Sequence, residues 1–186
     1  MPHPSPRLLT EIDTFRTSDK DVSVIIETPK GSRNKFDYEP DLNVFELAAV
    51  LPEGSVFPYD FGFLPSTLGD DGDPLDVLVL MDESVSTGCL VAARLVGVIE
   101  AEQTEKDGKK DRNDRLLAVA TRAHTHADVK TLEDLRPRMV DEIEHFFRSY
   151  NQTKGKVFTP TGRGGPERAL EIVQAGIERL KHQRKS

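Results

Sequence analysis

The sequence predicts an α+β fold, in which a small closed or sandwiched β-sheet carries helices packed on its outside. Three observations support this prediction. The β-branched run at 22–26 and the continuous apolar run at 77–81 are typical of strands. Beyond residue 131, apolar side chains recur at helical spacing instead. Because the strands precede the helices rather than alternate with them, the pattern favours α+β over a parallel α/β fold.

The first two thirds of the chain divide into short apolar runs separated by turn sequences such as Pro29–Ser32 and Leu51–Gly54. An aromatic stretch containing Pro58 and Gly62 covers residues 56–64. Strands are expected at 22–26, at 35–50 as a pair broken near Pro40, at 77–81, at 89–99 and at 116–120. The charged segment between the last two strands is expected to be a long loop.

The last third of the chain predicts two helices. Thr131 and Asp134 have the spacing of a capping box, and a main helix is expected to follow with Pro137 in its first turn. A second helix is expected to begin at Pro166, with the Gly-rich segment 162–165 as the loop before it. We expect residues 1–20 to be an N-terminal extension and residues 21–186 to be a single domain.

Composition excludes several classes of protein. The chain has 186 residues, a formal net charge of −7 and one cysteine, so a disulfide framework and a four-cysteine zinc site are excluded. No apolar run approaches the roughly 20 residues of a membrane helix, and the first residues do not resemble a signal peptide. We therefore expect a cytoplasmic protein without a membrane partner. The negative charge and the 6% aromatic content disfavour nucleic-acid binding.

The strongest chemical signal is an acidic loop at residues 69–76, which carries four aspartates just before the apolar run. Such a cluster repels itself, and a hard cation with oxygen ligands relieves the repulsion. Two other interpretations compete with a metal site. A solvated acidic turn is common, whereas a helix-loop-helix calcium site fits poorly because its fifth and twelfth positions, counted from Asp71, are Leu75 and Asp82.

The acidic loop carries a resemblance to a known family. The segment Asp71–Val79, with three aspartates, a glycine and a proline at set offsets, resembles the signature of the soluble family I inorganic pyrophosphatases. Further segments resemble motifs of that family and occur in the same order: 24–32, 35–38, 56–63 and 145–150. The resemblance implies a mainly β domain, an OB-type five-stranded barrel flanked by two C-terminal helices.

The resemblance also implies Mg²⁺-dependent hydrolysis of inorganic pyrophosphate to two phosphates, by a homo-oligomer. It suggests Asp73 as the general base, beside a water that Mg²⁺ activates, and Glu27 as a catalytic group that holds metal-bound waters. The remaining site residues that it implies are Asp71, Asp76 and Asn113 for metal and Lys35, Arg115 and Tyr150 for substrate. Each of these side chains alone has an ordinary structural explanation. The prediction therefore rests on their occurring together, in the same order along the chain as in the family.

The chain departs from the family pattern at five positions. Alanine replaces a phosphate-binding arginine at Ala49, and phenylalanine replaces a tyrosine at Phe61. The other three replacements, of a lysine and two metal-binding aspartates, are Asn151, Gln103 and Asn113. Nearby groups that could compensate are the cations Lys30 and Arg33 and the acids Glu102, Asp111 and Asp114. Two alternatives therefore stay open: a hydrolase of another phosphoanhydride, and a regulatory protein that binds metal or phosphate without catalysis.

Overall fold

Five strands form a closed barrel in the computed structural model, which describes residues 8–16 and 21–185. Around the barrel the order is β1 (Asp21–Thr28), β4 (Asp60–Leu64), β5 (Leu75–Leu80), β8 (Arg115–Ala120) and β6 (Leu90–Thr104). β6 pairs back with β1, which closes the ring. β5 and β8 are parallel, and the other neighbouring pairs are antiparallel. The predicted five-stranded barrel is thereby confirmed.

The barrel closes around an apolar interior. The side chains of β8 are all buried, and so are the last four of β5. Continuous apolar runs of this kind suit strands that are covered on both faces, since water reaches neither side. The core extends outward to Phe147 of the helix at residues 139–153 and to Phe57 of the loop before β4, and the rings of both pack against Phe61.

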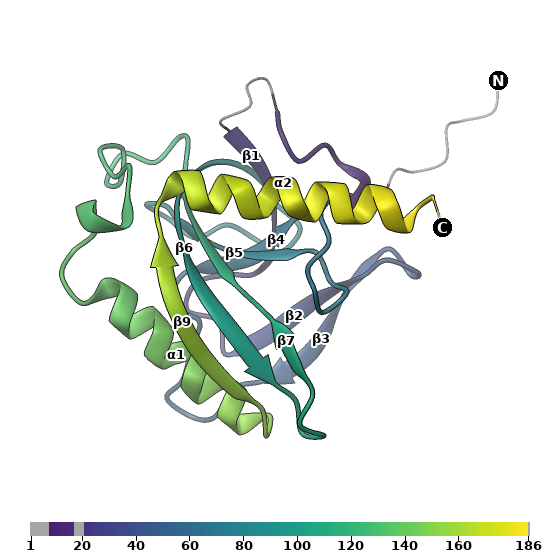
Figure 1. Cartoon of the computed structure of the whole chain (residues 1–186). Helices are drawn as coiled ribbons and strands as arrows, with labels where there is room; N and C mark the ends of the chain where they lie inside the picture. Colours follow the sequence, from purple (N-terminus) through teal and green to yellow (C-terminus); the bar gives the residue numbers. More distant parts are fainter. Residues whose placement is uncertain (1–7, 17–20, 186) are drawn as a thin grey trace.

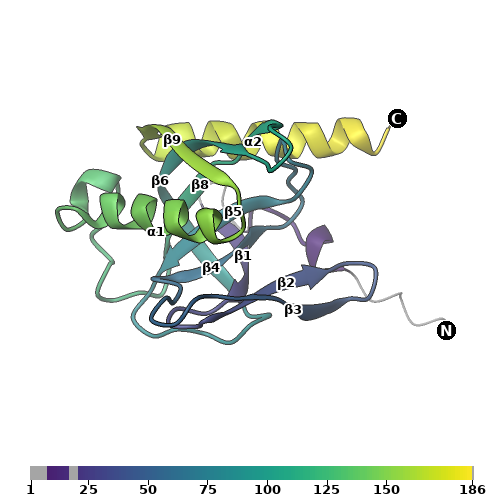
Figure 2. The same cartoon turned by 90° about the horizontal axis from the view of Figure 1, so that it is seen from below.

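Two helices cover the outside of the barrel, as predicted (Figure 1, Figure 2). α1 (Met139–Thr153) packs Ile143 and Phe147 into the core, and α2 (Pro166–Gln183) packs Ala169 and Val173. Short 3₁₀ turns lie at η1 (Leu9–Glu11) and η2 (Leu132–Asp134). Among the residues that the structure describes, neither helix is long and apolar enough to cross a membrane.

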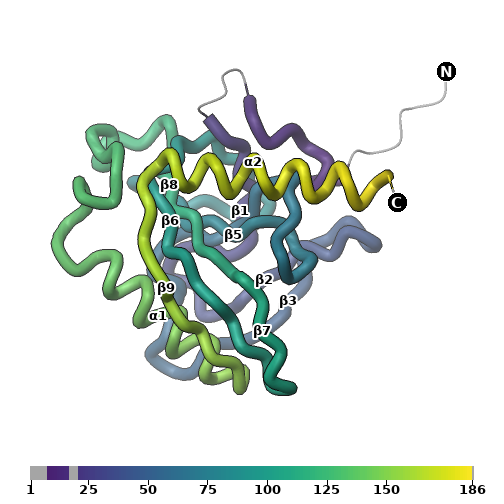
Figure 3. Tube along the Cα trace, viewed as in Figure 1, coloured from purple at the N-terminus to yellow at the C-terminus, as the bar shows by residue number. Residues whose placement is uncertain are grey.

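A hairpin and two further strands extend the barrel. The predicted pair at 35–50 forms the hairpin of β2 (Asn34–Glu39) and β3 (Val44–Val50) as a sheet of its own. β6 continues beyond the barrel, where β7 (Lys110–Arg112) and β9 (Val157–Gly164) pair with it on either side (Figure 3). The hairpin and β7 contribute residues to the lining of the candidate site.

Several local predictions were wrong. The charged segment after residue 99 is not wholly a loop, because β6 runs to Thr104 and β7 pairs with it. Residues 162–164 of the Gly-rich segment before α2 belong to β9. Hydrogen-bonded pairing with β6 makes them a strand although their own strand propensity is low. The capping box at Thr131 starts η2, and Pro137 lies before α1 rather than in its first turn.

The segment at residues 8–16 lies against the barrel. Thr14 is buried, its hydroxyl donates to the carbonyl of Pro65 (2.7 Å), and its own carbonyl accepts from the Ser23 N–H (2.7 Å). The rest of the predicted extension, residues 1–7 and 17–20, falls outside the described residues.

Gly62 permits β4 to approach β1 closely. A Cβ atom at this position would lie 1.9 Å from the backbone oxygen of Ile25, and backbone cannot move aside as a flexible side chain can. We expect Gly62→Ala to lower the free energy of unfolding by about 3 kcal/mol, the upper end for overpacked sites. Urea unfolding measures the change. Gly162→Ala is the matched control, since nothing lies within 4 Å of its added Cβ, and an equal loss there would contradict this explanation.

Candidate active site

All eight predicted site residues line one cavity of about 720 Å³, hereafter the site cavity. Glu27 lies near the end of β1, and Lys35 lies near the start of β2. The acidic loop, which leads into β5, contributes Asp71, Asp73 and Asp76. Asn113 and Arg115 come from the start of β8 and the residues before it, and Tyr150 comes from α1. The fold brings together side chains that are up to 123 residues apart in sequence, from Glu27 to Tyr150. Their individual roles stay predictions.

Hydrogen bonds at its base hold the acidic loop in shape. The buried hydroxyl of Thr67 donates to the Leu64 carbonyl (2.6 Å) and accepts from the Leu75 N–H (3.0 Å), so the two ends of the loop are joined. Inside the loop, the Gly69 N–H donates to the Asp73 carbonyl (2.6 Å) and the Asp73 N–H donates to the Asp71 carboxylate (3.2 Å). The aspartates are therefore presented from an ordered turn.

The three aspartates of the acidic loop that line the site cavity are poorly neutralised by the protein. Desolvation raises the pKa of Asp71, of Asp73 and of Asp76 above the usual aspartate value. The charge of Asp71 raises the pKa of Asp73 further. Arg115 opposes the effect at Asp76, whose carboxylate lies 2.6 Å from the guanidinium. A bound cation would stabilise all three carboxylates in their charged form.

Glu27 lies at an irregularity in β1, where the pairing with β4 shifts register between Ile26 and Thr28. Bulges of this kind re-aim a side chain. The carboxylate accepts from the Tyr38 N–H (2.9 Å) and lies 3.4 Å from the Lys35 ammonium. Burial raises the pKa of Glu27 to about 7, although Lys35 opposes the shift. A carboxyl group with such a pKa can exchange a proton near neutral pH.

Lys35 is buried and forms ion pairs with Glu27 and with Asp37. Burial alone would lower the pKa of its ammonium group, but the two carboxylates raise it overall. The ammonium also lies 5.1 Å from the centroid of the Phe61 ring, in cation–π geometry. Lys35 is therefore a cation at neutral pH.

Arg115 is packed between aromatic rings at the wall of the cavity. Its guanidinium carbon lies 4.8 Å from the ring centroid of Phe147 and 5.5 Å from that of Phe158. Nη1 contacts the Asp76 carboxylate and the side-chain oxygen of Asn113. Nε is buried without a hydrogen-bond partner among the described residues. Arg115 thus keeps a fixed orientation and an unused donor.

Tyr150 reaches the cavity from an aromatic cluster. Its ring packs at 5.6 Å from Phe57 and 5.9 Å from Phe146, measured between centroids. Burial raises the pKa of its hydroxyl to about 12, so the group is protonated and can donate a hydrogen bond. The aromatic packing determines where this hydroxyl lies.

Sequence reasoning missed several charged side chains of the site cavity, among them Asp37, Lys154 and Lys156. Asp37 pairs with Lys35, and Lys154 and Lys156 add positive charge to the lining. Lys154 lies 4.4 Å above the Tyr150 ring, and burial lowers the pKa of its ammonium group. The spacing of Lys154 four residues after Tyr150 was a usable signal, because such residues share one side of a helix end. Lys156 follows the helix, and periodicity does not locate it.

The five departures from the family pattern fall into two groups. Phe61, Gln103, Asn113 and Asn151 line the site cavity, whereas Ala49 is not among its lining residues. The amide group of Asn113 is engaged, because it donates to Gln103 (3.3 Å) while its oxygen accepts from Arg115. Asn151 donates to the Phe147 carbonyl (2.9 Å).

The groups that could compensate for these departures also differ in whether they line the site cavity. Neither Arg33 nor Lys30 lines the cavity: Arg33 pairs with Glu53, and Lys30 lies 6.0 Å from the Tyr59 ring. Of the three acids named as replacements, Asp111 lines the cavity. Asp114 instead accepts from the Ala101 N–H (3.0 Å) and pairs with Arg112, and Glu102 pairs with Lys110.

Comparison with known proteins identifies the family. The model of the family described as inorganic pyrophosphatase matches residues 24–181. This chain belongs to the inorganic pyrophosphatase family. An inorganic pyrophosphatase of Synechocystis is 39% identical over 160 residues, covering 86% of this chain and 92% of the relative. One of Thermus thermophilus is 39% identical over 163 residues, covering 86% and 90%.

Solved structures of inorganic pyrophosphatases share the fold. The crystal structure from Thermus thermophilus has a TM-score of 0.85 and 34% identity, covering 94% of this chain and 99% of that one. The structure from Neisseria gonorrhoeae has a TM-score of 0.83 and 28% identity, covering 92% and 98%. The barrel, both helices and the added strands therefore lie within an inorganic pyrophosphatase fold.

The site of this inorganic pyrophosphatase suits a metal that keeps part of its water shell. Pyrophosphatases of this family are metal-dependent hydrolases. Among the described residues, no three Asp, Glu, His or Cys side chains are gathered closely enough to form a ready-made metal cage. The donor set is a row of carboxylates in an open cavity, and desolvation raises the pKa of each of the three loop aspartates. Hard cations that bind through a few carboxylates, waters and substrate phosphate fit this arrangement.

Proposed function

We propose that the chain hydrolyses inorganic pyrophosphate to two phosphates, with Mg²⁺ as the metal. One observation carries the proposal: in a chain of this family, the acidic loop and the cations Lys35, Arg115 and Lys154 line the same cavity. A dense anion with bound cations needs both kinds of group, because the carboxylates hold the metal and the cations hold the phosphates.

Each side chain of the site has a separate role in the proposed reaction. Asp71 and Asp76 hold metal, and Asn113 is proposed to complete the set with its amide oxygen. Lys35, Arg115 and the Tyr150 hydroxyl bind phosphate oxygens, and Glu27 orients water. When bound, Mg²⁺ neutralises phosphate charge and makes water more acidic. Asp73 takes the proton of the attacking water on its carboxylate, and its raised pKa favours that step.

Phosphate release decides among the candidate functions. The assay uses pyrophosphate, tripolyphosphate and ATP, each with and without Mg²⁺. We expect fast release from pyrophosphate that depends on Mg²⁺. A preference for tripolyphosphate or ATP would instead favour a hydrolase of another phosphoanhydride. Tight Mg²⁺ binding without any hydrolysis would favour the regulatory protein and contradict the proposal.

Ala49 offers a test of how the chain binds phosphate. It pairs with Lys35 across the β2–β3 hairpin, and paired residues of antiparallel strands face the same side of the sheet. An arginine there could form two parallel hydrogen bonds to a phosphate, and a charge-assisted bond contributes roughly 1.5–3 kcal/mol. We expect Ala49→Arg to lower the KM for pyrophosphate by about tenfold, since 1.4 kcal/mol is a factor of ten.

Steady-state kinetics with pyrophosphate and tripolyphosphate measure the effect of Ala49→Arg. Ala48→Arg is the control, because Ala48 is exposed and lies at the irregularity of the β2–β3 pairing, where it is not paired with Lys35. A lower efficiency for pyrophosphate in Ala49→Arg, with unchanged thermal stability, would show that the added arginine crowds the site.

Three further expectations accompany the function. We propose that residues 21–186 form the catalytic domain and residues 1–20 its extension. A homo-oligomer is supported by the exposed apolar side chains Val44, Leu47 and Val50 on β3, an edge strand. Light scattering after size-exclusion chromatography measures the oligomer's mass. The cytoplasmic location stays a prediction from composition.

A further inference from the structure

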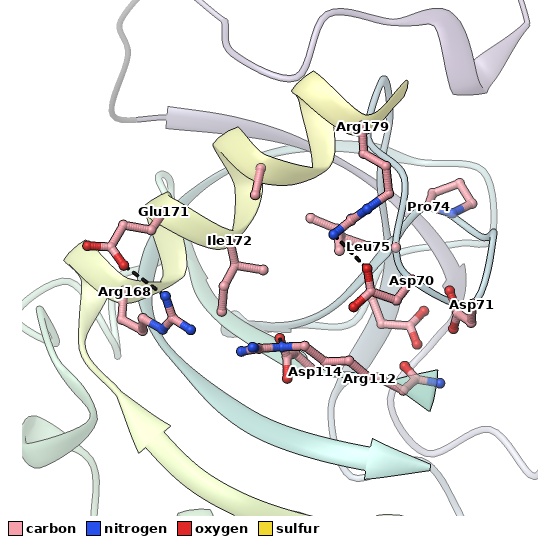
Figure 4. A pocket seen from close by; sticks show the side chains of 14 residues that line it. Asp70, Asp71, Pro74, Leu75, Arg112, Asp114, Arg168, Glu171, Ile172 and Arg179 are labelled. Atoms are coloured by element: carbon pink, nitrogen blue, oxygen red, sulfur yellow. Dashed lines mark hydrogen bonds and ion pairs between the residues drawn. The ribbon is translucent and has the colours of Figure 1, made fainter. Parts of the chain in front are cut away.

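The acidic loop has a second face, which lies against helix α2. Of its four aspartates, Asp70 does not line the site cavity. Its carboxylate is instead 2.6 Å from the guanidinium of Arg179 on α2. The close-up in Figure 4 shows Arg179 extending from the helix to this aspartate. One acid of the cluster is thus neutralised by the helix and directed away from the other three.

Arg179 also holds the backbone at the start of the loop. Its Nη1 donates to the carbonyl of Leu68, and the Leu68 N–H donates to the carbonyl of Gly176 (3.1 Å). A Cβ atom on Gly176 would lie 2.8 Å from Leu75 and 3.2 Å from the Leu68 oxygen. The close approach of the helix at this glycine lets α2 hold the residue that precedes the acidic loop.

The loop separates two cavities. Behind it lies a second cavity of about 240 Å³, hereafter the back cavity, lined by α2 side chains and by Asp70 (Figure 4). Asp71 and Asp76 line both cavities. Since these two aspartates belong to the loop that separates the two cavities, their positions depend on the contacts that the loop makes on its back-cavity side. Arg179 is an α2 side chain that bonds to this loop and to the residue before it.

We propose that Arg179 is a positioning residue for the metal site: by binding Asp70 and the Leu68 carbonyl, it fixes the acidic loop so that Asp71, Asp73 and Asp76 face the site cavity together. The proposal rests on the proposed function for its metal. Without Arg179, the negative charge of Asp70 is no longer paired next to Asp71, and the loop loses two anchors. The free protein then adopts the metal-binding arrangement less often, and metal affinity falls in proportion.

Direct Mg²⁺ binding without substrate tests this role. We expect Arg179→Ala to raise the Mg²⁺ dissociation constant in isothermal titration calorimetry by about tenfold, with the mid-point of thermal unfolding in EDTA nearly unchanged. The turnover at saturating Mg²⁺ should fall much less than the affinity. Arg168→Ala is the matched control, because Arg168 also lies on α2 and lines the back cavity but pairs with Glu100 and Glu171 instead of the loop.

A double-mutant cycle separates positioning from general destabilisation. If Arg179 acts through Asp70, Asp70→Ala should also weaken Mg²⁺ binding, and the double variant should bind no more weakly than Arg179→Ala alone. Wild-type affinity in Arg179→Ala, or an equal loss in Arg168→Ala, would overturn the proposal. Should Arg179→Ala fold poorly, Asp70→Ala tests the role by itself, and wild-type Mg²⁺ affinity in that variant would overturn the proposal equally. A wild type that binds Mg²⁺ without hydrolysing pyrophosphate would refute the proposed function while leaving this comparison valid.

Discussion

Asp76→Asn is expected to lower the turnover of pyrophosphate by about 10³-fold, since metal stabilisation of transition-state charge contributes several kcal/mol. Asp76 lines the site cavity, and its carboxylate lies 2.6 Å from Arg115. Asparagine keeps the shape of the side chain but removes its charge. The proposed metal ligand and the partner of the proposed substrate-binding cation are then both lost, so Mg²⁺ affinity should fall as well.

Initial rates across a Mg²⁺ titration measure the effect of Asp76→Asn, and thermal unfolding verifies that the fold is intact. Asp41→Asn is the control, because Asp41 is an exposed aspartate in the β2–β3 turn and lies outside the site cavity. Nearly normal turnover with normal Mg²⁺ dependence in Asp76→Asn would exclude Asp76 from the metal site.

Asp73→Asn is expected to lower kcat by about 10²- to 10⁴-fold, the typical cost of losing a general base. Desolvation and the charge of Asp71 raise the pKa of Asp73, which makes its carboxylate a better proton acceptor. Because the loss concerns proton transfer, Mg²⁺ affinity and the KM for pyrophosphate should change by less than about threefold.

The comparison with Asp71→Asn distinguishes a base from a ligand. Asp71 is assigned to the metal, so Asp71→Asn should weaken Mg²⁺ binding and partly recover its rate at high Mg²⁺. Asp73→Asn should not recover. If Asp73→Asn loses affinity and rate to the same extent and recovers with added Mg²⁺, Asp73 is a metal ligand and the base lies elsewhere, with Glu27 the next candidate.

Long-range pairing explains the local predictions that failed. The segment after residue 99 is polar and charged, so its sequence looks like a loop. It becomes strand because β7 and β9 hydrogen-bond to β6 on both sides. The strand β9 contains two glycines and a proline, which local propensity disfavours in strands. Hydrogen bonds to strands that are distant in sequence compensate for the low strand propensity. A local sequence pattern contains no information about those partner strands.

The residues that line the site could be predicted from the sequence, but most of the contacts between them could not. The eight predicted residues share one cavity because their motifs lie at strand ends, loops and a helix that the barrel brings together. The pairing of Lys35 with Asp37 and the engagement of Asn113 by Arg115 were not predictable. Those features depend on side-chain directions, which spacing along the chain leaves undetermined.

The family, the class of fold and the types of side chain available for chemistry follow from the sequence alone, because they depend on patterns within short segments and on the order of those segments. Only the tertiary structure decided which of those side chains act together. It directed Asp70 toward Arg179 and left its three neighbours in the site cavity, and it placed Arg33 and Lys30 outside that cavity. The physical reason is that a charged side chain takes the partner nearest in space, and packing of the barrel against α2 sets that distance.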